Sequence, residues 1–153
     1  MMGSPESEKG RYPWEDLHPV ILNQGFWLGD TAVTQAFYQA VTDKTPSAFN
    51  GENNPVENVD WNDAKSFCEE LNKNINAQQL RFQLPTDAQW EYACRAGTQS
   101  PFHFGDDVSL KQVNYRGTWE YESDKWGEGA LKQTVEVRSY PPNQFGLYEM
   151  HGN

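Results

Sequence analysis

The sequence predicts a single α+β domain with two or three short helices and little regular strand. Three observations predict this class. Amphipathic helical patterns occur only in the first two-thirds of the chain, the 12 glycines and 9 prolines are spread along it, and aromatic residues make up 14% of it. A chain of 153 residues has the length of one ordinary domain. We therefore expect one domain over residues 1–153, with a core pinned by aromatic side chains rather than by a wide sheet.

The first third of the chain contains one predicted helix. Residues 3–19 are polar and rich in turn formers, which predicts an exposed segment. Residues 20–30 predict two short strands around an Asn-Gln-Gly turn. Residues 34–43 predict a helix capped by Thr34, with an apolar face formed by Phe37, Tyr38 and Val41.

The clearest helical pattern follows a long loop. Residues 45–59 are dense in Asn, Pro and Gly, which is typical of a loop. In the stretch DWNDAKSFCEELNK that comes next, Asp60 is a candidate N-cap. Apolar side chains then recur at helical spacing, at Trp61, Ala64, Phe67, Cys68 and Leu71.

A strand and a third helix are predicted before the irregular end of the chain. LRFQL, residues 80–84, alternates as a strand does. Thr86 and Gln89 then form a capping-box pattern, which predicts a helix over 87–96 that ends at Gly97 and carries Trp90, Ala93 and Cys94 along one side. Beyond it only short candidate strands occur, such as residues 133–140.

The charge and hydropathy of the chain exclude several classes of function. A net charge of −10 argues against a nucleic-acid partner, because phosphate binding needs clustered Lys and Arg. The chain has no run of 18 apolar residues that would span a membrane. Its opening residues also lack the apolar core of a signal peptide, so by default we expect a cytoplasmic protein.

The order of five segments resembles the formylglycine-generating-enzyme (sulfatase-modifying factor) domain family. These segments are MGSPESE, NPVENVDWNDAKSFCEELN, RFQLPTDAQWEYACRAGT, VNYRG and YPPNQFGLYEMHGN, and together they run from Met2 to Asn153. The third is the most specific, because it matches the family pattern R-L-P-T-E-A-E-W-E-Y-A-x-R-G/A-G. The resemblance implies an irregular C-type-lectin-like fold. It also implies that the chain is the N-terminal portion of a longer domain, since it stops inside the family's G-N-V-W-E-W segment.

The two cysteines, Cys68 and Cys94, are poor candidates for chemistry. They are 26 residues apart, and neither has a base nearby in the sequence that would activate it as a nucleophile. His18, His103 and His151 show no metal-binding spacing. We expect buried free thiols, or cysteines bonded to each other or to another segment. The resemblance implies that the copper-binding cysteines of the family's oxidising members lie in the missing C-terminal part.

The large side chains of the motif segments are expected to be structural. Trp61, Trp90 and Tyr92 are predicted to lie in the core or to anchor loops, because aromatic side chains bury large areas and can bond loop carbonyls. Arg81 and Arg95 are predicted to pair with Asp or Glu side chains or with carbonyl groups.

The resemblance implies two calcium sites. The first would use Asn114, the Tyr115 carbonyl, Glu128 and the Ala130 carbonyl, with Asp124 as a substitute for Glu128. A solvated acidic loop accounts for these residues equally well. The second would begin with Glu149 and the Gly152 carbonyl and would take its remaining ligands from beyond Asn153, so this chain supplies at most half of it.

Two functions of different classes therefore stand side by side. One is the N-terminal portion of a domain that, when complete, oxidises a protein cysteine to formylglycine or performs a related oxidation; this chain alone would be inactive. The other is a non-catalytic module that binds a ligand or protein on a C-type-lectin-like scaffold. Because the chain ends inside a core motif, we also expect aromatic side chains that the missing segment would cover to form an apolar patch. Through this truncated edge the chain would associate with itself or with a partner protein.

Overall fold

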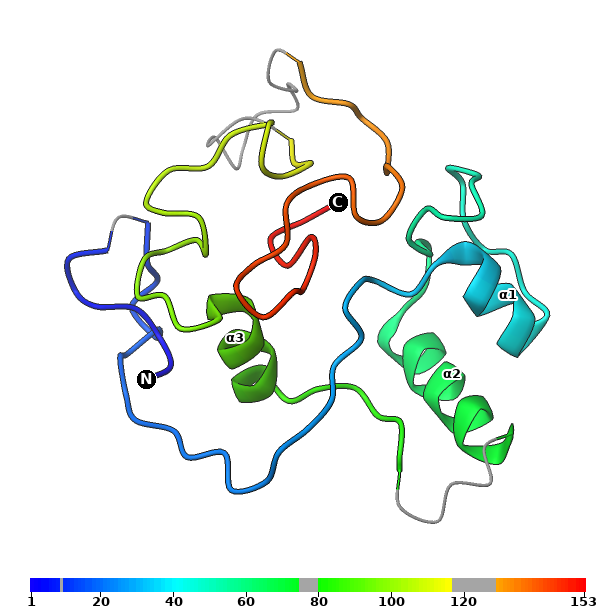
Figure 1. Ribbon diagram of the computed structural model, residues 1–153, viewed down its shortest axis with the longest axis horizontal. Helices are drawn as coiled ribbons and strands as arrows, with labels where there is room; N and C mark the ends of the chain where they lie inside the picture. The colour runs from blue at the N-terminus through cyan, green and yellow to red at the C-terminus, as the bar shows by residue number, and fades with distance from the viewer. Residues whose placement is uncertain (9, 75–79, 117–128) are drawn as a thin grey trace.

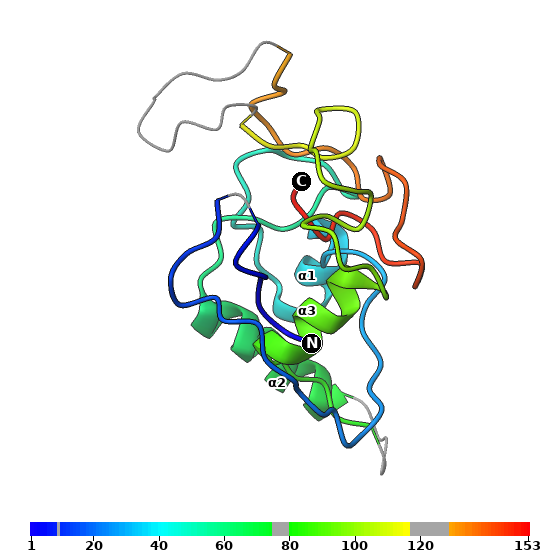
Figure 2. The same ribbon diagram turned by 90° about the vertical axis from the view of Figure 1, so that its left-hand side faces the viewer.

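The computed structural model describes residues 1–8, 10–74, 80–116 and 129–153. These residues contain three helices, α1 (Gln35–Thr42), α2 (Trp61–Asn74) and α3 (Asp87–Arg95), joined by long irregular segments (Figure 1). The chain after α3 gathers at one end of the molecule, away from α2, in both views (Figure 1, Figure 2). Three helices agree with the predicted number and, within one residue, with the predicted bounds. None of the described helices is long and apolar enough to cross a membrane.

Each helix begins where its capping residue predicts. The Thr34 side chain accepts a hydrogen bond from the Phe37 N–H, and Thr86 and Gln89 form the predicted capping box. At the start of α2, the Asp60 carboxylate accepts from the Asp63 N–H, 2.9 Å away. The third helix ends one residue before its predicted end, because Ala96 adopts the left-handed conformation at φ 46° and closes the helix before Gly97.

The apolar core lies between α1 and α2. Tyr38, Phe67 and Leu71 are buried, and the rings of Tyr38 and Phe67 stack with centroids 5.4 Å apart. Valines from the flanking loops and half-buried Cys68 pack against this cluster. The helical periodicity of residues 60–73 therefore identified the buried face of α2 correctly at Phe67 and Leu71.

The predicted strands at 20–30, 80–84 and 133–140 are wrong. The described residues contain only four isolated β-bridges. The last two segments bond to asparagine side chains in place of a neighbouring strand: the Asn72 amide bonds both the N–H and the C=O of Phe82, and the Asn153 amide does the same for Val135. A side-chain amide carries one donor and one acceptor, so it satisfies one residue of extended backbone without a sheet.

The tryptophan assignments also need correction. Trp61 is 65% exposed, Trp90 45% and Tyr92 53%, so none of the three is a core residue. Trp61 stands on the outer face of α2 because that helix is covered on one side only, by α1, and its ring lies against the Lys65 ammonium group. The buried residues of α3 are instead the small residues Ala93 and Cys94.

The segment predicted to be exposed, 3–19, is anchored at its start. Ser4 is buried, and Met2 and Ser4 form β-bridges with His18 and Asp16. Gly3 has φ +90°, and a Cβ at this position would lie 2.4 Å from the Asp16 carbonyl oxygen. Only glycine fits so close to that carbonyl, which explains the turn at the start of this segment.

Candidate functional site

The loops that follow α3 contain the residues of the predicted calcium sites. Asn114 is buried, and its side-chain NH2 group donates to the Gln133 carbonyl over 2.8 Å. Tyr115 and Ala130 are half-buried on the same loops. Glu128 and its substitute Asp124 lie outside the described residues. The structure describes Asn114, Tyr115 and Ala130, and the first calcium site itself stays a prediction.

Glu149 carries an unusual carboxylate. Both of its carboxylate oxygens are buried and have no hydrogen-bond partner in the described part of the chain. The residue has φ 48°, and its carbonyl accepts from the Gly152 N–H, which closes a turn. Burial, and then the charge of Glu149, raise the pKa of Tyr140. A buried carboxylate without donors is costly unless a cation compensates it, so Glu149 is the strongest cation ligand that the described chain offers.

The structure brings the two predicted calcium sites together. A Cβ on Gly152 would lie 3.1 Å from the Asn114 carbonyl oxygen and 3.3 Å from a methyl group of Val113. Gly152 has φ +140°, a backbone conformation reserved for glycine. The close approach of 113–114 to 149–152 was not visible in the sequence, since the two segments are separated by a long loop.

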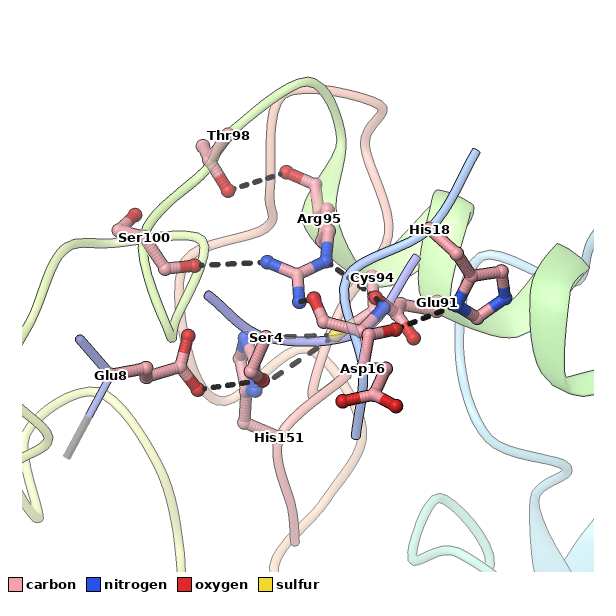
Figure 3. Close-up of polar contacts among 11 residues, drawn as sticks. Ser4, Glu8, Asp16, His18, Glu91, Cys94, Arg95, Thr98, Ser100 and His151 are labelled. Atoms are coloured by element: carbon pink, nitrogen blue, oxygen red, sulfur yellow. Dashed lines mark hydrogen bonds and ion pairs between the residues drawn. The ribbon is translucent and has the colours of Figure 1, made fainter. Parts of the chain in front are cut away.

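Cys94 contacts a histidine that no sequence pattern predicted beside it. Its Sγ lies 3.8 Å from Nδ1 and 3.7 Å from Nε2 of His151 (Figure 3). It also lies 3.7 Å from the Met150 carbonyl oxygen. The backbone N–H of His103 donates to His151 Nε2 over 3.2 Å. The neutral His151 ring therefore carries its proton on Nδ1, and the His103 and His151 rings stack at 5.1 Å.

The electrostatics of this pair exclude an activated thiol. Burial raises the pKa of the Cys94 thiol to about 11. Burial, followed by the nearby His103 and Arg95, lowers the pKa of His151 to about 4. Both side chains are therefore neutral near pH 7, whereas a nucleophilic cysteine needs a thiolate. The structure supplies the neighbouring base that the sequence lacked, but it confirms that Cys94 is a buried free thiol.

Glu91 and Arg95 join α3 to the start of the chain. Their side chains pair over 2.8 Å, one helical turn apart. Glu91 also accepts from the Gly3 N–H at 2.9 Å, and Arg95 donates to the Gly3 carbonyl at 3.0 Å and to the Ser100 carbonyl at 3.4 Å (Figure 3). The predicted structural role of Arg95, pairing with a carboxylate and with carbonyls, is confirmed. Arg81 is exposed at the surface.

A soft-metal site does not form around the two cysteines. Cys68 is a half-buried free thiol beside the α1–α2 core, where burial raises its pKa, and Cys94 belongs to the separate histidine cluster. Across the described ranges, no three His, Cys, Asp or Glu side chains are placed to hold a metal ion together. The residues present do not fit a copper centre.

An apolar hollow lies beside α3. It has a volume of about 740 Å³ and lies between the segment before α1, the first turns of α3 and the loop at 145–147. Its walls include Ile21, Phe26, Trp27, Tyr92 and Phe145. Trp27 is 94% exposed and Ile21 82%, so the rim of this groove presents large apolar side chains to solvent. The apolar patch and the association through it that the sequence predicts stay a prediction.

Known proteins resemble this chain along most of its length. A bovine formylglycine-generating enzyme is 36% identical over 141 residues, which covers 90% of this chain and 34% of the relative. A second bovine relative, an inactive C-alpha-formylglycine-generating enzyme 2, is 31% identical over 65% of this chain and 30% of its own length. The solved structure of PvdO from Pseudomonas aeruginosa superimposes with a TM-score of 0.75 at 30% identity, covering 99% of this chain and 63% of that one.

The family follows from a match along the whole sequence. The chain spans 34% of the length of the mouse and bovine formylglycine-generating enzymes that match it over 90% of its residues. The model of the sulfatase-modifying factor enzyme 1-like domain matches residues 1–153. The chain belongs to this family, as its sequence predicted.

Proposed function

We propose that the chain forms the scaffold portion of a formylglycine-generating domain, whose complete form oxidises a protein cysteine to formylglycine. The match of the family model to residues 1–153 carries this proposal, and the 36% identity to a formylglycine-generating enzyme supports it. The scaffold role rests on what the described residues do: they cap helices, bond loop backbone and bury small side chains. The activity of the whole domain, its substrates and its partners are parts of the same proposal.

Within this proposal the chain alone does not perform the oxidation. Oxidation through copper needs thiolate ligands held close together, because the thiolate is the form that binds a soft metal. Cys94 is protonated near pH 7, Cys68 also has a raised pKa, and the two lie in different clusters. Neither cysteine therefore supplies the chemistry, and both contribute packing.

Peptide oxidation tests the absence of activity. The purified chain is incubated with copper, oxygen and a cysteine-containing peptide, and formylglycine is measured by mass spectrometry. We expect no product above a control that contains copper alone. A formylglycine yield that rises with the concentration of the chain, and that persists in a Cys94→Ser variant, would show that other residues perform the reaction.

We further propose that Glu149 binds a calcium ion, with the Gly152 carbonyl as a second ligand and Asn114 beside it. The support is chemical: Glu149 has two buried carboxylate oxygens without donors, and calcium prefers carboxylate and carbonyl oxygens on loops. A bound ion would compensate the buried charge and hold the turn at 149–152 against the loop at 113–114. The bound calcium ion would therefore stabilise the fold and take no part in the oxidation.

Two carboxylate variants separate a bound ion from a merely costly carboxylate. Because this chain supplies at most half of the site, we expect only high concentrations of calcium to raise its melting temperature, and we expect Glu149→Gln to abolish that rise. In the presence of a chelator, Glu149→Gln should be at least as stable as the parent, because it removes an uncompensated buried charge. Glu136→Gln, at an exposed position nearby, controls for the change in net charge and should retain the response to calcium. An equal response to calcium in parent and Glu149→Gln contradicts the proposed ligand.

A second function is favoured by the apolar groove. A non-catalytic module on a C-type-lectin-like scaffold would use a preformed hollow such as the one of about 740 Å³ beside α3. One relative is named as inactive, and the similarity to it is compatible with a binding module as well as with an enzyme. The two proposed functions differ in whether the complete domain forms formylglycine. A complete domain that binds a polypeptide but forms no formylglycine would favour the binding module.

A further inference from the structure

The loop that joins α1 to α2 (Figure 1) contains a chemically reactive pair of residues. Asn is followed by Gly at one place in the 153 residues, at Asn50–Gly51 within this loop. Glycine has no side chain to shield its backbone nitrogen, so a neighbouring group reaches this nitrogen more easily than at other residues. The side-chain amide of an asparagine places a carbonyl carbon directly before it. The pair therefore brings together the two groups that can close into a cyclic imide.

The Asn50 side chain is free to react. It is exposed and makes no hydrogen bond to any described residue. The side-chain amides of Asn72, Asn114 and Asn143 each bond loop backbone, so these bonds would have to break before the side chains could move. Asn23 is also exposed and unbonded in the described part of the chain, but the residue after it is a glutamine. Asn50 thus combines a free side chain with a following glycine.

Gln35, the first residue of α1, holds the backbone on both sides of Asn50. Its side-chain NH2 group donates to the carbonyl of Phe49 over 2.8 Å and to the carbonyl of Pro55 over 3.2 Å. Its side-chain oxygen accepts from the Gly51 N–H over 3.2 Å, at the long end of the range for such bonds. We call these three bonds the Gln35 clamp. All of its residues belong to the described chain, and the nitrogen that it binds is the one that would attack Asn50.

A small hollow borders the same loop. It has a volume of about 150 Å³, and its lining includes Gln35, Ser47, Asn50, Gly51 and Glu52. A water molecule takes roughly 30 Å³ in the liquid, so the hollow has room for several, and its lining offers them polar partners. The water that opens a cyclic imide is therefore at hand beside the reacting pair.

We propose that Asn50 is a site of spontaneous deamidation and that the Gln35 clamp sets its rate. The Gly51 nitrogen forms a bond to Cγ of Asn50, the bond from Cγ to the side-chain nitrogen breaks, and ammonia leaves with the proton that Gly51 lost. One water molecule then opens the imide. Opening at Cγ gives aspartate, and opening at the backbone carbonyl gives isoaspartate. One water is consumed and one ammonia released for each event, and nothing is oxidised or reduced.

The clamp opposes this reaction. The Gly51 nitrogen cannot attack while its N–H points at Gln35 Oε1, so ring closure occurs in the fraction of molecules whose clamp is open. Glycine is nevertheless required in the closed loop, since a Cβ at position 51 would lie 2.7 Å from Cγ of Asn54. The fold therefore needs the glycine that makes Asn50 reactive, and it limits the reaction through Gln35.

Isoaspartate at position 50 loosens the attachment of the loop to α1. In isoaspartate the chain continues through the former side chain, which adds one carbon to the backbone before residue 51. The clamp holds Phe49 and Gly51 on the two sides of this point, so the longer backbone cannot keep both bonds in place. The bond from the Ala36 N–H to the Glu52 carbonyl, 3.1 Å long, belongs to the same connection. Deamidation therefore releases the loop from the first turn of α1.

Peptide mapping by mass spectrometry measures the reaction on the intact folded chain. During incubation in mildly alkaline buffer, Asn50 should convert to aspartate and isoaspartate, whereas Asn23, the internal control, should convert far more slowly. Gln35→Ala should speed the reaction about fivefold, the factor that corresponds to about 1 kcal/mol for a lost hydrogen bond. Gln39→Ala, at an exposed position one turn further along α1, is the matched control and should leave the rate unchanged. Circular dichroism verifies that both variants are folded.

Hydrogen exchange tests the effect on the loop. The Ala36 amide should exchange faster in the aged chain than in Asn50→Asp, because that variant carries the added charge on a backbone of normal length. Equal exchange in the two samples would contradict the release of the loop.

Gln35→Glu isolates the bond to the reacting nitrogen. A carboxylate at position 35 still accepts from the Gly51 N–H but cannot donate to the two carbonyls, so this variant should react more slowly than Gln35→Ala. Conversion at Asn50 no faster than at Asn23, equal rates in Gln35→Ala and Gln39→Ala, or aspartate formed without isoaspartate would overturn the proposal. Each of these results is independent of whether the complete domain oxidises cysteine.

Discussion

The α1–α2 region and the region around α3 are held together by different kinds of contact. Between α1 and α2, the side chains of Tyr38, Phe67 and Leu71 form an apolar cluster. The buried apolar residues of α3 itself, Ala93 and Cys94, are small, and long-range hydrogen bonds from side chains to backbone connect the loops around it. Asn143 alone bonds the carbonyls of Ala93 and Cys94 and accepts from the backbone N–H groups of two loop residues. One region therefore depends on apolar area and the other on satisfied polar groups.

The contrast shows how a domain with few helices and no described strand keeps its shape. Loop backbone cannot be buried unless its N–H and C=O groups find partners. In the α3 region those partners are side-chain amides and the Glu91–Arg95 pair, each fixed to one location. Apolar clusters tolerate changes of shape, whereas a hydrogen bond is lost when its partner is removed. We therefore expect the two regions to respond differently to substitution.

The largest effect is expected from the apolar cluster. Phe67→Ala should lower the free energy of unfolding by about 3–5 kcal/mol, because it removes a buried ring that stacks on Tyr38 and meets Phe37 edge-on. Urea denaturation followed by fluorescence measures the loss. Trp61→Ala on the exposed face of α2 is the control and should cost less than about 1 kcal/mol. Equal losses in both variants would mean that the cluster is not the core of this region.

The α3 region should respond next most strongly, at Asn143. Asn143→Ala leaves buried carbonyls at the end of α3 and two loop N–H groups without partners, and we expect a loss of about 2–3 kcal/mol. Asn72→Ala, which removes two bonds to Phe82 at the surface, should cost about 1 kcal/mol, since water replaces the lost partner. Urea denaturation of the two variants compares them. A loss at Asn143 no greater than that at Asn72 would contradict the importance of burial.

The same contrast explains how much of the molecule could be predicted from its sequence. The helices follow from periodicity and capping patterns, which are local, so Thr34, Thr86 and the Phe67 face of α2 were predicted correctly. The position of Asn143 under α3, and the contact between Cys94 and His151, join residues about 50 or more positions apart. No spacing or period in the sequence encodes such contacts. The strands failed for a related reason, because alternation predicts an extended backbone but does not say whether a neighbouring strand exists.

For the candidate site, residue types could be predicted from the sequence, but their burial and hydrogen-bond partners could not. Glu149 was predicted as a ligand through a family resemblance, and only the structure shows that its carboxylate is buried without donors. The groove beside α3 could not be predicted, because its walls come from three separate segments. The exposed tryptophans were placed wrongly because a large aromatic residue on an amphipathic helix suggests burial.

Acid should weaken the α3 region specifically. The folded chain keeps His151 neutral down to about pH 4, whereas the unfolded chain binds this proton near pH 6.5. Stability is therefore fully present above pH 6.5 and is lost progressively as the pH falls toward 4. Burial lowers the pKa of His103 in the same direction. Because His151 is only partly buried, we expect its share of the loss between about pH 7 and pH 5 to be roughly 1 kcal/mol.

Urea denaturation of the parent and of His151→Gln, each measured at pH 7 and at pH 5, isolates the contribution of His151 to the loss of stability. Carboxylates elsewhere in the chain also titrate in this range, so the quantity of interest is the difference between the two pH dependences. The variant should lose less stability on acidification than the parent. Parallel losses in the two proteins would show that His151 is protonated equally in the folded and unfolded chains.

The smallest effect compares one ion pair in each region. Glu91 pairs with Arg95 in a half-buried setting and also bonds the Gly3 N–H, whereas Glu70 pairs with Lys73 on the open surface of α2. Glu91→Ala should lower the free energy of unfolding by about 1 kcal/mol and should speed hydrogen exchange at the Gly3 amide, because the start of the chain loses its anchor on α3. Glu70→Ala should change neither quantity measurably, since solvent screens an exposed pair. Exchange measured by NMR separates a local release of the N-terminal segment from a general loss of stability. Faster exchange throughout α3 in the Glu91 variant would instead mean that the pair supports the helix itself.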